Sequence, residues 1–135
     1  MNISPGSQIE EHKAILEQAI LETEEGSLQV YNILDAKKNV VAYFLADPLD
    51  PELVRDIYIT SPLAHTEDAI RIGDTFGDLA TKHPDLEVYF SKIEARTIAT
   101  LGSLSFKIDA VHPTDNLEIS AISKEAKILE IVIER

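Results

Sequence analysis

The sequence contains no cysteine and no tryptophan, and it has a single methionine. The absence of cysteine excludes disulfide bonds, cysteine-ligated zinc or iron–sulfur centres and a thiol nucleophile within these 135 residues. Aromatic residues make up only 6% of the chain, which weakens the case for a sugar-stacking platform. A length of 135 residues fits one domain with a sizeable core, so the fold does not need a disulfide bond to be stable.

Basic residues are also scarce. Lys and Arg number 12 against 24 Asp and Glu, which gives a formal net charge of −12. This balance argues against nucleic acid, whose affinity comes largely from Lys and Arg on phosphates, and against anionic membrane surfaces. It favours either simple solubility or a basic protein partner.

Long hydrophobic runs are missing as well. The longest apolar run, residues 40–46, is far shorter than the ~20 residues that a helix needs to cross a bilayer. No basic region followed by an apolar signal segment is visible near Met1. We therefore predict no transmembrane span. Two localisations stay open, a cytoplasmic protein or an exported mature domain whose leader has been removed.

The sequence contains none of the catalytic motifs that we considered. The four histidines (His12, His65, His83 and His112) are scattered and form neither His-x-His nor His-Glu-x-x-His. No nucleophile elbow or P-loop occurs, and residues 73–77 lack the third glycine of a dinucleotide fingerprint. We predict no catalytic residue, no cofactor and no metal site, hence a non-enzymatic protein. The loops around Asp47 and Glu67 carry oxygen ligands suited to weak calcium binding, but turn capping is the favoured interpretation.

Hydrophobic periodicity predicts an α+β fold. Residues 7–21 carry an apolar stripe at helical spacing behind a Ser7–Glu10 capping box, and Gly26 closes the acidic segment that follows, so we expect an N-terminal helix. The polar turn 35–39 separates two strands that form a hairpin. The remaining expected strands are 53–59, a short extended segment 69–72, 86–91, 96–101, 104–108 and 127–133.

A second, short helix is expected between Gly73 and Pro84, with Asp74 or Thr75 as its N-cap. Gly73 suggests a positive φ or close strand–helix packing. Phe76 and Leu79 are expected to fix this helix on a core of Ile57, Val88, Phe106 and Ile131. The strand connections are too short for parallel crossovers. We therefore predict a single α+β domain over residues 1–135, with one N-terminal helix and a mostly antiparallel, twisted β-sheet.

The strand–glycine–helix segment at residues 70–79 carries a resemblance to a known family. Asn39-Val40-Val41 with Phe44, the strand 54–59 and the Ile-rich closing strand 127–135 fit the same layout. With these features the chain resembles the bacterial envelope lipoproteins described as sigma-E (RpoE)-regulated, a domain of unknown function. The resemblance implies an exported, membrane-tethered α+β domain in the periplasm or at the outer membrane. It supplies no catalytic residues, and any lipid-bearing cysteine would lie in a leader outside this sequence.

Acidic side chains gather in three places, which are the candidate partner-binding residues. They are Glu22, Glu24 and Glu25, then Asp47, Asp50 and Glu52 in a proline loop, then Glu67 and Asp68 in a further loop. The first group would oppose the macrodipole at the end of the expected helix, which hints at a role other than stability. We predict a binding module for a basic protein. The alternative is an acidic inhibitor or immunity protein that blocks a basic partner.

Overall fold

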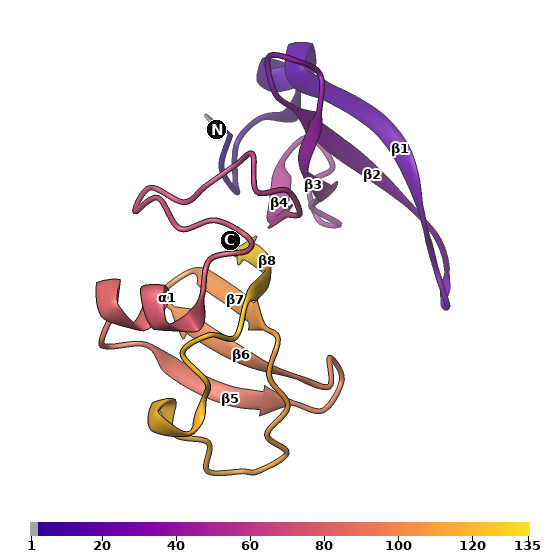
Figure 1. The fold of residues 1–135 in the computed structure, drawn as a ribbon. Coiled ribbons are helices and arrows are strands. Elements are labelled where there is room, and N and C mark those ends of the chain that lie inside the picture. The colour runs from indigo at the N-terminus through magenta and orange to yellow at the C-terminus, as the bar shows by residue number, and fades with distance from the viewer. Residues whose placement is uncertain (1–2) are drawn as a thin grey trace.

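The computed structural model describes residues 3–135, and its framework is an eight-stranded sheet in the order β1-β2-β3-β4-β8-β7-β6-β5 (Figure 1). Every neighbouring pair of strands is antiparallel. With its short helical segments, this architecture confirms the predicted α+β class with a mostly antiparallel sheet. In chain order the elements are the 3₁₀ helix η1 (Ile9–Ile15), β1 (Leu16–Thr23), β2 (Gly26–Leu34), β3 (Val40–Ala46), β4 (Val54–Ile59), α1 (Phe76–Lys82), β5 (Glu87–Ser91), β6 (Arg96–Leu101), β7 (Leu104–Ile108), the 3₁₀ helix η2 (Ile119–Ala121) and β8 (Ile128–Ile133).

The predicted α-helix over residues 7–21 is wrong. The segment folds as η1 followed by β1, which pairs with β2 along its whole length. Thr23 pairs with Gly26, so Glu24 and Glu25 form a two-residue hairpin turn, and Gly26 has φ +124°. Gly26 therefore supports a hairpin turn instead of ending a helix. The predicted capping box does not form, because Glu10 pairs with Lys13 and the Ser7 hydroxyl accepts a hydrogen bond from the Ser4 amide.

A second correction concerns residues 69–72, which form no strand. Ala69 has φ +62°, which breaks any extended run, and the buried Ile70 anchors the loop. The amide of Ile70 donates to the buried Thr66 hydroxyl over 3.1 Å. The 3₁₀ helix η2 was not predicted from the sequence. The other strands lie within one residue of their expected bounds, and β2 begins two residues before the expected start at Leu28.

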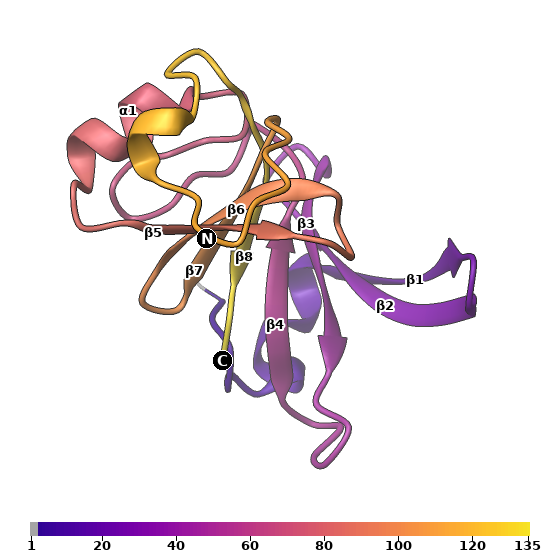
Figure 2. The ribbon, with the colours of Figure 1, turned by 90° about the horizontal axis from the view of Figure 1, so that it is seen from below.

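Two meanders share the sheet. Strands β1–β4 form the first and β5–β7 the second, and β8 lies between β4 and β7 and joins them. Its link to β4 rests on three residue pairs, from Ile57↔Ile133 to Ile59↔Ile131. Figure 2 shows β4 and β5 running in clearly different directions, as a strongly twisted sheet requires. The segment from residue 60 to 86, which contains α1, connects the two meanders (Figure 1).

The core lies on one face of this sheet. Phe44, Ile57, Phe106 and Ile131 are fully buried there, and α1 adds Phe76 and Leu79 to the same cluster. The predicted packing of α1 is thus confirmed, with Val88 only partly buried. The N-cap is Thr75, whose hydroxyl accepts from the Asp78 amide (3.1 Å) while the Asp78 carboxylate accepts from the Thr75 amide (3.3 Å). Gly73 has the expected positive φ, +91°.

Within residues 3–135, no helix has the length and apolar character that crossing a membrane would require.

Candidate functional site

The three predicted acidic groups lie in three separate loops. Glu22, Glu24 and Glu25 lie at the turn of the β1–β2 hairpin, which extends away from the other strands in both views (Figures 1 and 2). No helix ends there, so the expected conflict with a helix macrodipole does not arise. Glu22 accepts a hydrogen bond from the Ser27 hydroxyl over 2.7 Å. Glu24 and Glu25 are exposed.

The carboxylates of the β3–β4 loop organise their own turn. Asp47 accepts from the Leu49 amide (2.9 Å) and forms an ion pair with Arg135, while Asp50 accepts from the Glu52 amide (3.2 Å). The hydrogen bond from the Leu49 amide, assisted by the charge of Arg135, lowers the pKa of Asp47 below its usual value. These contacts match the turn-capping interpretation of the loop.

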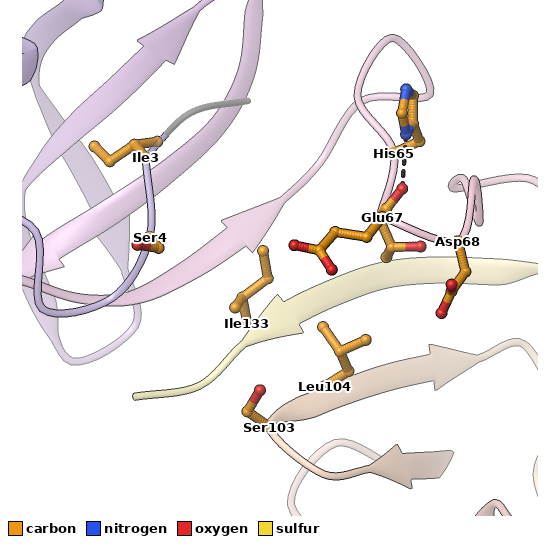
Figure 3. Close-up of a pocket in the computed structure, with 9 residues that line it drawn as sticks. Ile3, Ser4, His65, Glu67, Asp68, Ser103, Leu104 and Ile133 are labelled. Atoms are coloured by element: carbon orange, nitrogen blue, oxygen red, sulfur yellow. Dashed lines mark hydrogen bonds between the residues drawn. The ribbon is translucent and has the colours of Figure 1, made fainter.

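Glu67 and Asp68 line a cleft of about 450 Å³ between the N-terminal segment, the loop after β4 and the ends of β7 and β8 (Figure 3). Their side chains diverge (Figure 3). Asp68 lies 3.1 Å from Nε2 of His83, and Nδ1 of His65 contacts the Thr66 carbonyl oxygen at 2.7 Å. The rest of the lining is formed by Ile3, Ser4, Ser103, Leu104 and Ile133.

Within the part of the chain that the structure describes, no ion pair or hydrogen bond joins two titrating side chains that both line this cleft. Asp68 pairs with His83, which lies outside the lining, and His65 contacts the Thr66 carbonyl oxygen through Nδ1. Among the described residues, no three His, Asp or Glu side chains come together as a metal site would require. The cleft offers Glu67 beside serine hydroxyls and aliphatic side chains, an arrangement suited to weak polar contacts.

Four side chains with a raised pKa lie elsewhere, on the sheet face opposite the core. Register places one row of side chains across four strands there: Tyr89 on β5, Ile98 on β6, Lys107 on β7 and Glu130 on β8. A parallel row runs through Ser105, Val132, Tyr58 and Tyr43. Most of these residues, together with Ser91, Ile93, Glu94 and Glu134, line a groove of about 240 Å³ that we call the outer groove.

A lysine between two glutamates dominates the outer groove. Nζ of Lys107 lies 2.8 Å from Glu94 and 3.7 Å from Glu130. Burial raises the pKa of Glu130, and the nearby charge of Glu94 adds to this effect while Lys107 opposes it. The hydrogen bond to Glu94 raises the pKa of Lys107. Perturbed titrating groups in a groove are a recognised sign of a functional site, although structural ion pairs produce them too.

Two tyrosines extend this cluster toward β3. The rings of Tyr43 and Tyr58 stack with centroids 4.9 Å apart and an interplanar angle of 11°. Burial, reinforced by the charge of Glu130, raises the pKa of Tyr43 to about 12, and burial likewise raises the pKa of Tyr58. The sequence analysis missed this site. Its only signal is polar residues at alternate strand positions, which any solvent-facing strand shows.

No protein-family model and no curated protein sequence matches the chain. Its fold is similar to that of a solved structure, described as the crystal structure of the uncharacterized protein yfeY from Escherichia coli, with a TM-score of 0.60 and 13% sequence identity. The match covers 98% of this chain and 90% of that one. The two proteins therefore share an architecture over nearly their full lengths. At this identity the likeness establishes the fold alone.

Proposed function

We propose that this chain is a non-enzymatic binding module of the bacterial cell envelope that docks a basic protein partner through the β1–β2 hairpin. The envelope assignment rests on the resemblance to the sigma-E-regulated lipoproteins described above, and the alternative is a cytoplasmic protein. A lipid tether would need a cysteine outside residues 1–135, because none of these residues is cysteine. The rest of the proposal rests on the shape and charge of the hairpin.

The observation that carries the proposal is an apolar strip on a hairpin arm that extends away from the core. Leu21 and Leu28 are cross-strand partners, so their side chains share one face, and both are exposed. Ile20, on the other face, is 61% exposed. An arm with apolar groups on both faces buries little when the chain is alone, whereas a partner would remove this surface from water.

Charge decides what kind of partner fits the arm. Glu22, Glu24 and Glu25 surround the apolar strip at the turn, and a basic surface complements them. A second copy of this chain is a poor partner, because each copy has a net charge of −12 and the two would repel each other. The outer edge of β1 pairs with no other strand among the described residues, so its backbone can also accept an added strand.

The other predicted residues add less to the proposal. Asp47, Asp50 and Asp68 already have hydrogen-bond or ion-pair partners close by. Glu52 and Glu67 are exposed and remain candidate partner contacts. The proposal therefore assigns the main docking role to the arm and a general steering role to the remaining acidic loops.

The test begins by identifying the partner with a photo-crosslinking residue at Leu28, compared with the same residue at Val111, which is exposed in a loop away from the arm. Association kinetics are then measured with the purified partner. The triple variant Glu22→Gln, Glu24→Gln, Glu25→Gln should slow association several-fold and flatten its salt dependence, with dissociation little changed. The matched control, Asp115→Asn, Glu118→Gln, Glu125→Gln, changes the net charge equally and should keep most of the rate.

Equal loss in both triple variants would show that only net charge matters and would remove the arm from the proposal. A salt-independent association rate would remove its electrostatic part. A partner enzyme that is inactivated on binding would identify the chain as the inhibitor or immunity protein of the alternative. Turnover of a defined substrate that is lost on changing one carboxylate or histidine would overturn the non-enzymatic assignment.

A further inference from the structure

We propose that the outer groove binds a lysine or arginine side chain presented by an extended, apolar-flanked peptide segment of a partner protein. This inference goes beyond the proposed function, because the groove lies over β4, β8, β7 and β6 on the face opposite the core, whereas the arm is formed by β1 and β2. The groove and the arm are therefore separate surfaces that separate substitutions can test.

The floor of the groove suits an aliphatic stem. Val132 on β8 pairs with Tyr58 on β4, and both line the groove. Ile98 faces away from the core but is only 7% exposed, so the accessible apolar surface of the floor comes from the half-buried Val132 and Tyr58. Such a floor can cover the methylene groups of a lysine or arginine while the charged head remains at the rim.

The carboxylates of the groove outnumber its cations. Glu94, Glu130 and Glu134 line it, and the only lysine or arginine among the described lining residues is Lys107. Lys107 lies between Glu94 and Glu130, while Glu134 accepts a hydrogen bond from the Ser105 hydroxyl over 3.0 Å. Burial raises the pKa of Glu130, and the charge of Glu94 adds to this effect while Lys107 opposes it. A second cation entering the groove would stabilise the ionised carboxylates.

The position of the carboxylates fits one cation above the floor. Glu130 and Val132 alternate along β8, and Glu134 follows the end of the strand, so the two carboxylates lie on either side of Val132 along the chain, each about 7 Å from it at strand spacing. Tyr58 lies beside Val132, and one face of its ring is stacked on Tyr43. A lysine or arginine stem lying on Val132 would bring its charged head to either carboxylate.

Apolar side chains at the rim favour a peptide over a free amine. Ile93, in the β5–β6 turn, is 98% exposed, and Tyr89 is half exposed, and both line the groove. A free diamine would contact the charged centre and leave this apolar rim in water. Apolar residues on both sides of a basic residue would cover it. A second copy of the chain is disfavoured by its net charge of −12.

The experiment is an amide NMR titration of the ¹⁵N-labelled chain with a capped pentapeptide that has lysine at its centre and leucine on either side. We expect saturable shifts at Ile98, Lys107 and Val132, with the arm residues unmoved. The same peptide with norleucine in place of lysine should bind at least tenfold more weakly, and so should 1,5-diaminopentane. The double variant Glu130→Gln, Glu134→Gln should weaken lysine-peptide binding at least tenfold, while the control Glu118→Gln, Glu125→Gln should not.

Three results would overturn the inference. The first is an absence of saturable shifts in the groove with the folded protein. The second is equal binding of the lysine and norleucine peptides, which would indicate a purely apolar site. The third is equal binding of the diamine and the peptide, which would indicate a free-amine site. Because the arm variant Glu22→Gln, Glu24→Gln, Glu25→Gln should leave peptide binding intact, failure here is distinguishable from failure of the proposed function.

Discussion

At the residue scale, Gly73 is the position where backbone conformation most restricts the choice of side chain. Its φ is +91°, and a Cβ built there would meet no atom within 4 Å. Gly73→Ala should therefore destabilise through backbone strain alone, by about 1–2 kcal/mol in denaturant unfolding. Gly73→Asn should cost less, because asparagine tolerates positive φ. Equal stability of the alanine variant and the wild type would contradict this account.

The charge state of Glu130 provides a second residue-scale prediction. Burial raises its pKa in the folded state, so ionisation of Glu130 disfavours folding at pH values above that folded-state pKa. The penalty is lost as pH falls through the folded-state pKa, and below the usual glutamate value of 4.5 both states are protonated. Glu130→Gln should thus raise the Tm at pH 7, and its advantage should shrink toward pH 4.

Thermal unfolding at several pH values checks this expectation, with Glu94→Gln as the comparison, because it removes the closer partner of Lys107. A lower Tm for Glu130→Gln at pH 7 would show that attraction to Lys107 outweighs the burial of the carboxylate.

At the element scale, the capping box of α1 offers a direct test of what starts this short helix. Thr75→Ala removes the hydroxyl that accepts from the Asp78 amide and should cost about 1 kcal/mol. Thr81→Ala is the matched control, because the Thr81 hydroxyl only donates to the Gly77 carbonyl one turn back. Its expected effect is neutral or slightly stabilising. Equal losses in both variants would argue that the helix depends on its threonines in general.

The elements also show why residues 7–21 were mispredicted. A Ser7–Glu10 spacing, helical periodicity and a closing glycine all favour a helix, yet the same Gly26 suits a hairpin turn. Pairing of β1 with β2 over eight residues satisfies the backbone of β1 along one edge. The local sequence pattern does not show whether a strand or a helix is more stable here, because the hydrogen bonds that favour the strand come from a different segment, β2.

At the scale of the whole molecule, the sheet predicts a single cooperative transition. Strand β8 joins the two meanders, and its Ile131 is fully buried in the shared core. Ile131→Ala should lower the stability of both halves together by about 2–5 kcal/mol. Leu129→Ala, in the same strand but 40% exposed, should change it by less than about 0.5 kcal/mol.

Differential scanning calorimetry measures this outcome, supported by amide exchange in β3 and β6 as reporters of the two meanders. Two resolved transitions, or exchange that changes in only one meander when Ile131 is truncated, would show that β8 does not couple them. Such a result would also contradict the single-domain prediction over residues 1–135, of which the structure describes residues 3–135.

The sequence by itself determined features that depend on neighbouring residues, namely strand patterns, helix ends, a turn glycine and core positions. A continuous apolar run predicted β3, and alternating apolar residues predicted β5 and β7. Pro84 predicted the end of α1, Gly73 suggested a positive φ or close packing, and Phe76 and Leu79 were expected in the core. Only the tertiary structure decided that residues 16–23 form a strand, that the three acidic loops lie apart and that the outer groove forms. The physical reason is that Tyr58, Lys107 and Glu130 come together through strand register, and register depends on which distant segments pair.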